Sequence, residues 1–408
     1  MQTAAIIIFV ITYTGVAIGS FPGLKLDRTG IALLGAIAMV TASVMTTHQA
    51  ILSIHTSTIL LLYALMVISA QLRLSGFYTQ LAVSITRFAK NPRKFLFIIM
   101  LTSAVLSAVL ANDIVCLAFT PIICFSLLEA RINPIPFLIG LAVSSNIGSA
   151  ATIIGNPQNM LLGQVGKLHF GNFILFCIVP VIISLIAAYY IIYLIYRHKF
   201  EILSPAHISE RRKSWPQFNQ HQTRKGLAVV IILLILFFSP IPRELSALAL
   251  AGLLLCSRSM HSRTILGLID WHLITLFCAL FIVIAGIEIS GVPTYLVNYL
   301  NSHHINIQNL VNLTFISSIL SNIVSNVPAV MLIIKFLDPS QAVQWYVTAL
   351  ASTFAGNFII IGSIANLIVI EGAKEYQIHI SFKEHAKVGI PVTLVSILLT
   401  IAWVLVIT

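Results

Sequence analysis

Apolar segments recur along the whole chain, and many are about as long as a helix that crosses a lipid bilayer. Residues 4–19, 31–44, 173–196 and 388–407 are apolar all round, without the polar face that a helix on a water-soluble domain needs. Hydrophobic residues make up 58% of the 408 positions and charged residues only 9%. The alternating ten-residue strands of a membrane β-barrel are missing from the sequence. The chain is therefore predicted to be an all-α polytopic membrane protein.

The second half of the chain repeats the pattern of the first. Residues 61–65 and 75–81 correspond to residues 276–280 and 290–296. Five further pairs follow in the same order: Ser107 and Ser321, Asn112 and Asn326, Gly155 and Gly362, Asn159 and Asn366, Pro180 and Pro391. We interpret the chain as two copies of one membrane module, because such repeats are common in transporters.

The repeat predicts the domain organisation. The first module covers residues 1–196 and the second covers residues 227–408, and a basic linker at 197–226 joins them. In each module the early helices are expected to form a scaffold, followed by a hairpin and a broken helix. The scaffold parts are residues 1–94 and 227–309, and the hairpin and broken-helix parts are residues 95–196 and 310–408.

The net charge of +11 comes from Lys and Arg residues whose positions follow the positive-inside rule for membrane proteins. When successive spans alternate in direction, 20 of the 23 Lys and Arg residues fall on the cytoplasmic side, including those of the linker. Only Lys167, Arg243 and Lys335 fall outside. The basic excess therefore sets the topology, and no nucleic-acid partner is expected.

This orientation makes the two modules antiparallel. Residues 57–72 cross from the outside to the cytoplasmic side, whereas the matching residues 274–287 cross in the opposite direction. Each module continues with a pair of short apolar segments that begins and ends on one side: 95–111 with 114–128, and 310–324 with 328–337. Charge counting does not separate re-entrant hairpins from pairs of full crossings. We favour re-entrant hairpins, because each pair turns at a polar tip inside apolar sequence. Inverted-topology repeats of this kind are typical of secondary transporters.

The polar tips are candidate binding elements. The first contains Asn112 and Asp113, and the second contains Ser325 and Asn326. Backbone at membrane depth is tolerated only where it is buried in protein or lines a watery cavity. The end of the first helix of a hairpin offers carbonyls to a cation, and the start of the second offers amides to an anion. We expect both tips to face one cavity.

A second interruption follows each tip and predicts a discontinuous transmembrane helix. Small residues, Gly and Asn there would unwind the helix and leave polar groups in the membrane. The candidate residues are Ser145, Asn146, Gly155, Asn156 and Asn159 in the first module, and Thr353, Asn357, Gly362 and Asn366 in the second. Close packing between helices is the alternative explanation for the Ser and Gly residues. The repeated Asn residues favour two related polar pockets, since buried amides need partners.

Asp113 is the one carboxylate within these motifs. An acid near the bilayer centre costs about 3 kcal/mol on insertion scales, so its presence indicates a function. We predict ion binding or proton exchange. Two alternatives are capping of the second hairpin helix and an interfacial position. The His residues show no ligand spacing and are given no role. No cofactor is expected beyond a sodium ion or proton as the coupling ion.

Together these motifs resemble the ion transporter superfamily. The resemblance lies in the two tips, in residues 145–159, and in Gly362 and Asn366 followed by residues 381–382 and 389–391. The superfamily includes arsenite permeases, citrate transporters, divalent-anion:sodium symporters and a sodium/proton antiporter branch. The resemblance implies a homodimeric elevator-type transporter. It also implies sodium sites at Asn112, Asp113 and Gly155, and at Asn326 and Gly362.

The tips differ from those of the symporters, which read Ser-Asn-Thr. Here they read Ala111-Asn112-Asp113 and Ser325-Asn326-Val327. An ionised Asp113 would repel a di-anion unless a cation lies between them or the acid is protonated. This argues against a dicarboxylate and makes the first tip more similar to the arsenite-permease branch.

The predicted function is secondary active transport of a small inorganic or organic anion across the bacterial inner membrane, cation-coupled or driven by the potential. Arsenite or antimonite efflux and sodium/proton antiport through Asp113 are alternatives. A passive anion channel is the alternative from another class. A membrane enzyme is not expected, because the sequence shows no nucleophile and base at catalytic spacing.

Overall fold

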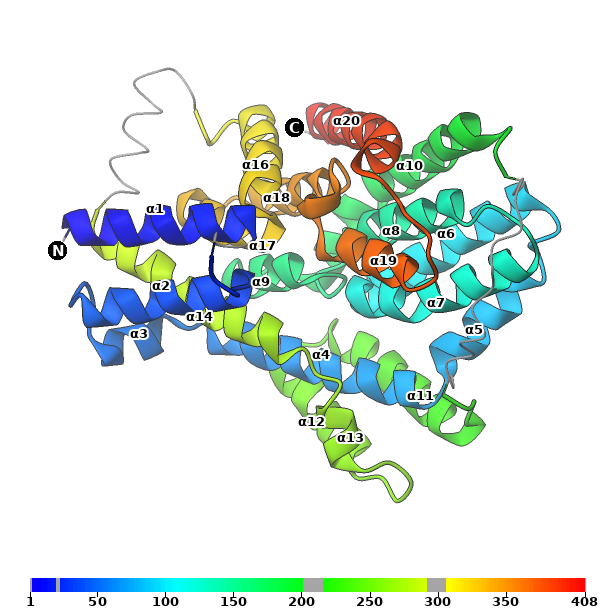
Figure 1. Ribbon diagram of the computed structural model, residues 1–408. Coiled ribbons are helices and arrows are strands. Elements are labelled where there is room, and N and C mark those ends of the chain that lie inside the picture. Colours follow the sequence, from blue (N-terminus) through cyan, green and yellow to red (C-terminus); the bar gives the residue numbers. More distant parts are fainter. Residues whose placement is uncertain (1, 20–22, 201–215, 292–305, 408) are drawn as a thin grey trace.

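The computed structural model describes residues 2–19, 23–200, 216–291 and 306–407, and the regular secondary structure in these ranges is helical (Figure 1). This confirms the predicted all-α class. Within these ranges, six helices are long and apolar enough to cross a membrane: α4 (Thr56–Leu74), α6 (Pro92–Val109), α7 (Asn112–Glu129), α10 (Phe170–Tyr196), α14 (Trp271–Ile289) and α20 (Phe382–Ile407). The chain is an integral membrane protein.

The other helices are shorter. Those of the first half are α1 (Gln2–Ile18), α2 (Arg28–Thr41), α3 (Thr47–Ser53), α5 (Phe77–Thr86), α8 (Ile135–Ser149) and α9 (Pro157–Val165). Those of the second half are α11 (Gln220–Leu236), α12 (Arg243–Leu255), α13 (Ser262–Leu266), α16 (Leu310–Val324), α17 (Asn326–Ile333), α18 (Ala342–Ala355) and α19 (Ile364–Lys374). Two short 3-10 turns, η1 (Ile334–Phe336) and η2 (Ile360–Gly362), follow α17 and precede α19.

Among the described residues, the matched helices follow the same order in both halves. A short helix, α3 or α13, precedes a helix of 19 residues, α4 or α14. Each half ends with a long helix, α10 of 27 residues or α20 of 26 residues, and each contains a proline, Pro180 or Pro391. The matched residue pairs in the sequence thus correspond to matched helices.

The two halves pack in exchanged pairs. Helix α2 of the first half packs against α14, and α12 of the second half packs against α4. In the same way α7 packs against α19, and α17 packs against α9. Exchanged pairs are what a two-fold relation between the halves produces, so neither half forms a separate globular unit. Figure 1 shows α9 and α19 near the centre of the molecule, between α4 and α18.

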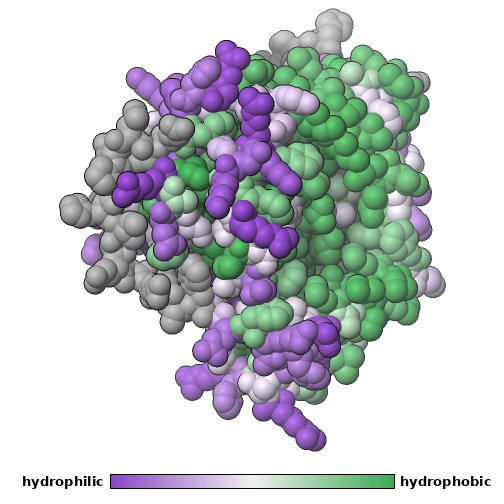
Figure 2. Space-filling view, turned by 90° about the vertical axis from the view of Figure 1, so that its right-hand side faces the viewer, coloured by the Kyte–Doolittle hydropathy of each residue, from purple (hydrophilic) through white to green (hydrophobic). Residues whose placement is uncertain are grey.

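The surface has the distribution expected for a protein in lipid. Hydrophobic side chains cover the right-hand flank of the face in Figure 2, and hydrophilic side chains gather in the middle and at the lower edge of that face. Large apolar side chains such as Leu175, Leu194 and Leu398 are more than half exposed. In a bilayer this surface faces acyl chains, where its exposure costs nothing.

Helix α11 begins inside the segment expected to be a linker, residues 197–226. Its first turn is capped by Asn219, whose side chain accepts a hydrogen bond from the Gln222 N–H at 3.1 Å. The Asn219 N–H donates to the Ser75 carbonyl at 2.8 Å. An Asn side chain is a favourable N-cap, so α11 begins at Gln220, before the predicted end of the linker at residue 226.

Candidate functional site

The first hairpin turns within two residues. Leu110 and Ala111 have extended backbone angles, with ψ of 152° and 129°, and these angles end α6. Helix α7 starts at Asn112, whose N–H donates to the carbonyl of Gly155 at 3.3 Å. Gly155 lies in the gap between α8 and α9, so the hairpin tip contacts a break in another helix.

The gap between α8 and α9 is closed by polar side chains. Asn156 caps α9, accepting the N–H of Asn159 at 2.8 Å. The Asn159 side chain donates to the carbonyls of Ser149 and Thr152, at 3.3 and 3.0 Å. These carbonyls have lost their helical partners at the break, and an unpaired buried carbonyl is costly. Asn159 was expected in unwound backbone, but it lies in the first turn of α9, because Pro157 is favoured as the first residue of a helix.

The second half repeats this arrangement between α18 and α19. Ser363 caps α19 by accepting the N–H of Ala365 at 3.2 Å. The Asn366 side chain donates to the carbonyls of Gly356 and Ile359, at 2.8 and 3.2 Å. Asn366, like Asn159, lies inside the following helix and not in the break. The repeat-related residues Asn159 and Asn366 therefore donate to the carbonyls of the helix break in the same way in both halves.

The second hairpin has a sharper tip than the first. A single residue, Ser325, separates α16 from α17, with φ 75° and ψ 159°. This region of backbone space is populated almost only by glycine and costs about 1–3 kcal/mol for other residues. The following residue, Asn326, contacts both ends of the α18–α19 break. In the amide orientation that satisfies its neighbours, its nitrogen donates to the carbonyls of Ser352 at 3.0 Å and Gly362 at 3.2 Å.

Asn146 joins the two halves at the centre of the site. Its side-chain nitrogen donates to Oδ1 of Asn357 at 2.9 Å and of Asn366 at 3.2 Å. Its oxygen accepts from Nδ2 of Asn112 at 3.2 Å and from Oγ of Ser363 at 2.9 Å. A buried amide with two donors and two acceptors filled is fully satisfied and held in one orientation. The first tip and the second break thus meet at Asn146.

Further contacts across the halves extend this cluster. Asn156 Nδ2 donates to Thr353 Oγ1 at 3.2 Å and to Ser149 Oγ at 2.9 Å. Within the first half, Ser145 Oγ lies 2.8 Å from Ser107 Oγ and donates to the Asn112 carbonyl at 3.3 Å. The predicted pockets are therefore linked into one buried polar cluster.

The structure brings most of the predicted site residues into this cluster. They are Asn112, Ser145, Asn146, Gly155, Asn156, Asn159, Asn326, Thr353, Asn357, Gly362 and Asn366. All the Asn residues among them are buried. Asp113 and Ser325 lie beside the cluster and are only partly buried. The Asp113 carboxylate has no cation partner among the ion pairs of the described residues.

Two residues of the site were missed from the sequence. Ser363 was not singled out, although a Ser before a helical segment is a recognisable cap. His385 was given no role, yet it is buried on α20 and its Nε2 lies 3.1 Å from the Asn357 carbonyl. No spacing pattern marks a lone histidine of this kind, since its partner is distant in the sequence.

The second tip also borders open space. A cavity of about 420 Å³ is lined by Ser325 and Pro328 from the hairpin and by Arg28 and Asp270 from α2 and the start of α14. Arg28 and its neighbours belong to the side that the charge pattern assigns to the cytoplasm. The cavity therefore lies beside the tip that carries Asn326.

Comparison with known proteins agrees with this description. Residues 6–355 match the family model of the citrate transporters, CitMHS. The silicon efflux transporter LSI3 of rice, Oryza sativa subsp. japonica, is 26% identical over 447 residues, which cover 92% of each chain. A Dictyostelium discoideum protein named transporter arsB is 24% identical over 491 residues, covering 92% of this chain and 87% of its own.

A solved structure has the same fold. The crystal structure of the YdaH transporter of Alcanivorax borkumensis superposes with a TM-score of 0.57 at 12% sequence identity, covering 98% of this chain and 97% of that one. The predicted resemblance to the ion transporter group is thereby confirmed. With most of its length matched by the family model and its helices arranged as in a known transporter, the chain belongs to the citrate transporter family, CitMHS.

Proposed function

We propose that this membrane transporter is a secondary active carrier that moves a small inorganic or organic anion across the bacterial inner membrane. The observation that carries the proposal is the single buried cluster in which both hairpin tips and both helix breaks meet. Amides, hydroxyls and freed carbonyls at helix ends can bind an anion and its coupling cation together.

An elevator mechanism is part of the proposal. The scaffold would comprise residues 1–94 and 227–309, and the moving domain residues 95–196 and 310–408. The exchanged helix pairs support an inverted relation between the modules. Helices α16 and α17 have 15 and 8 residues, or about 22 and 12 Å at 1.5 Å per residue, which is short of a 30 Å hydrocarbon core. This length supports a re-entrant second hairpin. In the first hairpin, the contact between Asn112 and Gly155 holds the tip inside the protein, although α6 and α7, with 18 residues each, are long enough to cross a membrane.

The cluster suggests an oxygen-bearing solute. Asn357 Nδ2 is buried and has no acceptor among the described residues. A buried donor without a partner costs about 1–3 kcal/mol, and a solute oxygen would remove that cost. Asp113, together with the Asn112 side chain and the Gly155 carbonyl, is the proposed site for sodium or a proton. The Asn326 side chain and the Gly362 carbonyl are the second proposed cation site.

Efflux of arsenite, antimonite or a similar oxyacid is a second candidate. The polar side chains of the cluster are amides and hydroxyls, and none of the cluster residues named above carries a positive charge. Neutral donors suit a neutral or weakly charged oxyacid better than a di-anion. The similarity to proteins named silicon efflux transporter and arsB supports this candidate.

Transport by purified protein in proteoliposomes tests the proposal. Arsenite, silicic acid, sulfate, phosphate, citrate and succinate are each tried with and without a sodium or pH gradient. A carrier shows saturable uptake and trans-stimulation by its own substrate. Flux that neither saturates nor exchanges would indicate a channel, and proton-linked sodium movement alone would indicate an antiporter. Cross-linking in membranes tests the proposed homodimer.

A further inference from the structure

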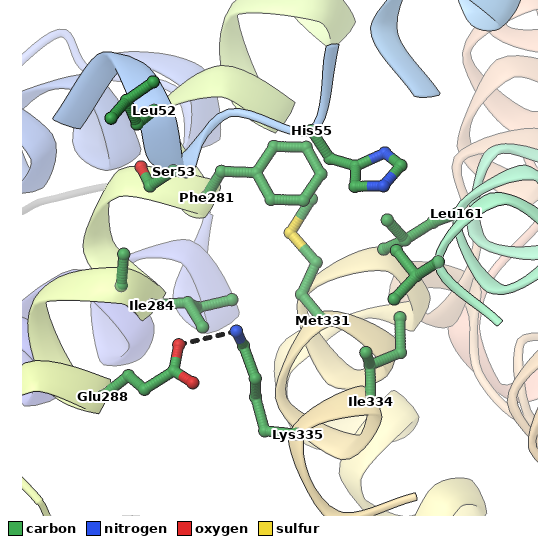
Figure 3. Close-up of a pocket in the computed structure, with 12 residues that line it drawn as sticks. Leu52, Ser53, His55, Leu161, Phe281, Ile284, Glu288, Met331, Ile334 and Lys335 are labelled. Atoms are coloured by element: carbon green, nitrogen blue, oxygen red, sulfur yellow. Dashed lines mark hydrogen bonds and ion pairs between the residues drawn. The ribbon is translucent and has the colours of Figure 1, made fainter. Parts of the chain in front are cut away.

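Polar bridges join the two proposed domains on one side of the molecule. Lys335, next to the second hairpin, forms an ion pair with Glu288 at the end of α14 at 2.6 Å (Figure 3). Arg243 at the start of α12 donates to the carbonyls of Gly163, at 3.3 Å, and of Leu168.

A third contact lies beside Arg243. Gln164 Nε2 donates to the carboxylate of Glu244 at 3.3 Å. In every case one partner belongs to the proposed scaffold and the other to the proposed moving domain. We call these three contacts the outer bridges.

The outer bridges account for two exceptions in the charge pattern. Lys167, Arg243 and Lys335 are the cations that the alternating topology leaves outside the cytoplasm. The positive-inside rule disfavours cations there, so those that remain need another reason. Arg243 and Lys335 each hold the two domains together. Lys167 is exposed and takes no part in the bridges.

Glu288 and Lys335 both line an apolar cavity of about 340 Å³. Figure 3 shows Phe281 and Ile284 from α14 facing Leu161 and Met331 from the other domain, with the ion pair at the edge. Burial lowers the pKa of His55, which also lines the cavity.

The repeat-related position on the cytoplasmic side is Arg28, which lines a cavity among the described residues. Arg28 starts α2 as Arg243 starts α12, and it corresponds to Arg243 at the same offset that relates α4 to α14. Arg28 lines the cavity that borders Ser325. The positions of Glu288 and Lys335 are occupied in the first half by Arg73 and Pro121, and both line one cavity there. Since proline carries no charge, these two positions cannot form an equivalent ion pair.

We propose that the outer bridges are a closed gate of this transporter and that Arg28 closes the opposite gate when the moving domain shifts. The inference rests on the proposed elevator mechanism, in which the site opens to one side of the membrane at a time. Arg243 and Arg28 then stabilise opposite conformations of the transporter, although both act through a guanidinium group. Loss of Arg243 removes contacts found only in the conformation described here, whereas loss of Arg28 removes contacts made only in the other.

The test measures accessibility from outside and needs no substrate. Leu161→Cys, on the cavity wall, is introduced after the five native cysteines are replaced, and its reaction with a membrane-impermeant maleimide is followed in right-side-out vesicles. Lys335→Met should raise the labelling rate about two- to fivefold, as expected for a partly exposed ion pair. Arg243→Ala should raise it about tenfold, because charged hydrogen bonds to carbonyls are stronger. Arg28→Ala should lower it.

Two controls separate a gate from general loosening. Lys167→Ala removes an outer cation that makes no bridge and should leave the rate unchanged. The exchange Glu288→Lys with Lys335→Glu should return the rate toward that of the parent. Unchanged labelling in Arg243→Ala, or a rise in Arg28→Ala equal to that in Arg243→Ala, would overturn the gate. Absence of transport in the parent protein would instead overturn the proposed function, and the labelling result would stand.

Discussion

Single amide side chains hold the broken helices of this transporter together. Asn159 and Asn366, related by the repeat, each use one nitrogen to satisfy two carbonyls that a helix break has released. The recurrence of Asn at both positions follows from this hydrogen-bonding requirement.

Replacing these residues should weaken both halves alike. Asn159→Ala removes the side-chain donor of the buried Ser149 carbonyl, and Asn366→Ala removes that of the Gly356 carbonyl, each at a cost of about 1–3 kcal/mol. We expect a lower melting temperature in detergent and reduced transport for each variant. Asn312→Ala, which removes one exposed bond to the Asn306 carbonyl, is the matched control and should change neither. A normal melting temperature in either cluster variant would contradict this explanation.

Asp113 stands out because it is polar, partly buried and adjacent to the first tip. Its N–H donates to Oδ1 of Asn112 at 3.0 Å, and it lies in the first turn of α7, where a negative charge is favourable. Asp113→Asn keeps the shape and removes the charge. If the carboxylate binds the coupling ion, transport should lose its dependence on sodium or pH while the protein stays folded. Retained dependence, measured as uptake against pH and sodium concentration, would leave only the helix-capping role.

At the scale of elements, the breaks depend on close approach of backbone to backbone. A Cβ atom added to Gly155 would lie 2.2 Å from the Ser149 carbonyl oxygen, which is far inside van der Waals contact. The turn between α8 and α9 therefore requires glycine at this position. The first tip contacts the same glycine, because the Asn112 N–H donates a hydrogen bond to the Gly155 carbonyl.

Gly155→Ala should disrupt the break and the tip together. We expect loss of transport and a destabilisation of a few kcal/mol, since backbone must move to relieve the clash. Gly252→Ala, in the middle of α12 with open space around the added carbon, is the control. It should be neutral or stabilising by up to about 1 kcal/mol because alanine favours a helix. Equal melting temperatures for the two variants would show that the break tolerates a side chain.

At the scale of the whole molecule, the halves are interlocked and not placed side by side. The pairs α2 with α14 and α4 with α12 cross between the halves, as do α7 with α19 and α9 with α17. Asn146 adds hydrogen bonds between them at the centre. Each half alone would expose these surfaces.

Dividing the chain tests this interlocking. Residues 1–200 and 216–408, co-expressed as separate chains, should co-purify, because the exchanged interfaces remain intact. Either chain expressed alone should aggregate or be degraded. Asn146→Ala in the divided protein should reduce the yield of the pair. Recovery of a monodisperse single half in gel filtration would contradict the arrangement.

Much of the fold follows from local patterns. The apolar segments predicted the crossing helices, and the repeat predicted matched elements from α4 and α14 to α10 and α20. The boundary of α11 was misplaced, since a cap at Asn219 outweighs the polar composition that suggested a linker. Asn159 and Asn366 were expected in unwound backbone, yet each lies in the first turn of a helix, because the start of a helix depends on the cap and not on the polarity of a single residue.

By itself, the sequence determined the membrane class, the duplicated plan and most residues of the polar cluster, because hydrophobicity and repetition are read along the chain. The tertiary structure decided which of those residues meet. Asn146 contacts partners more than 200 positions away, and His385 reaches the carbonyl of Asn357 from another helix. Such partners are chosen by how the two halves interlock. That choice depends on the packing of whole helices and leaves no mark in the spacing of nearby residues.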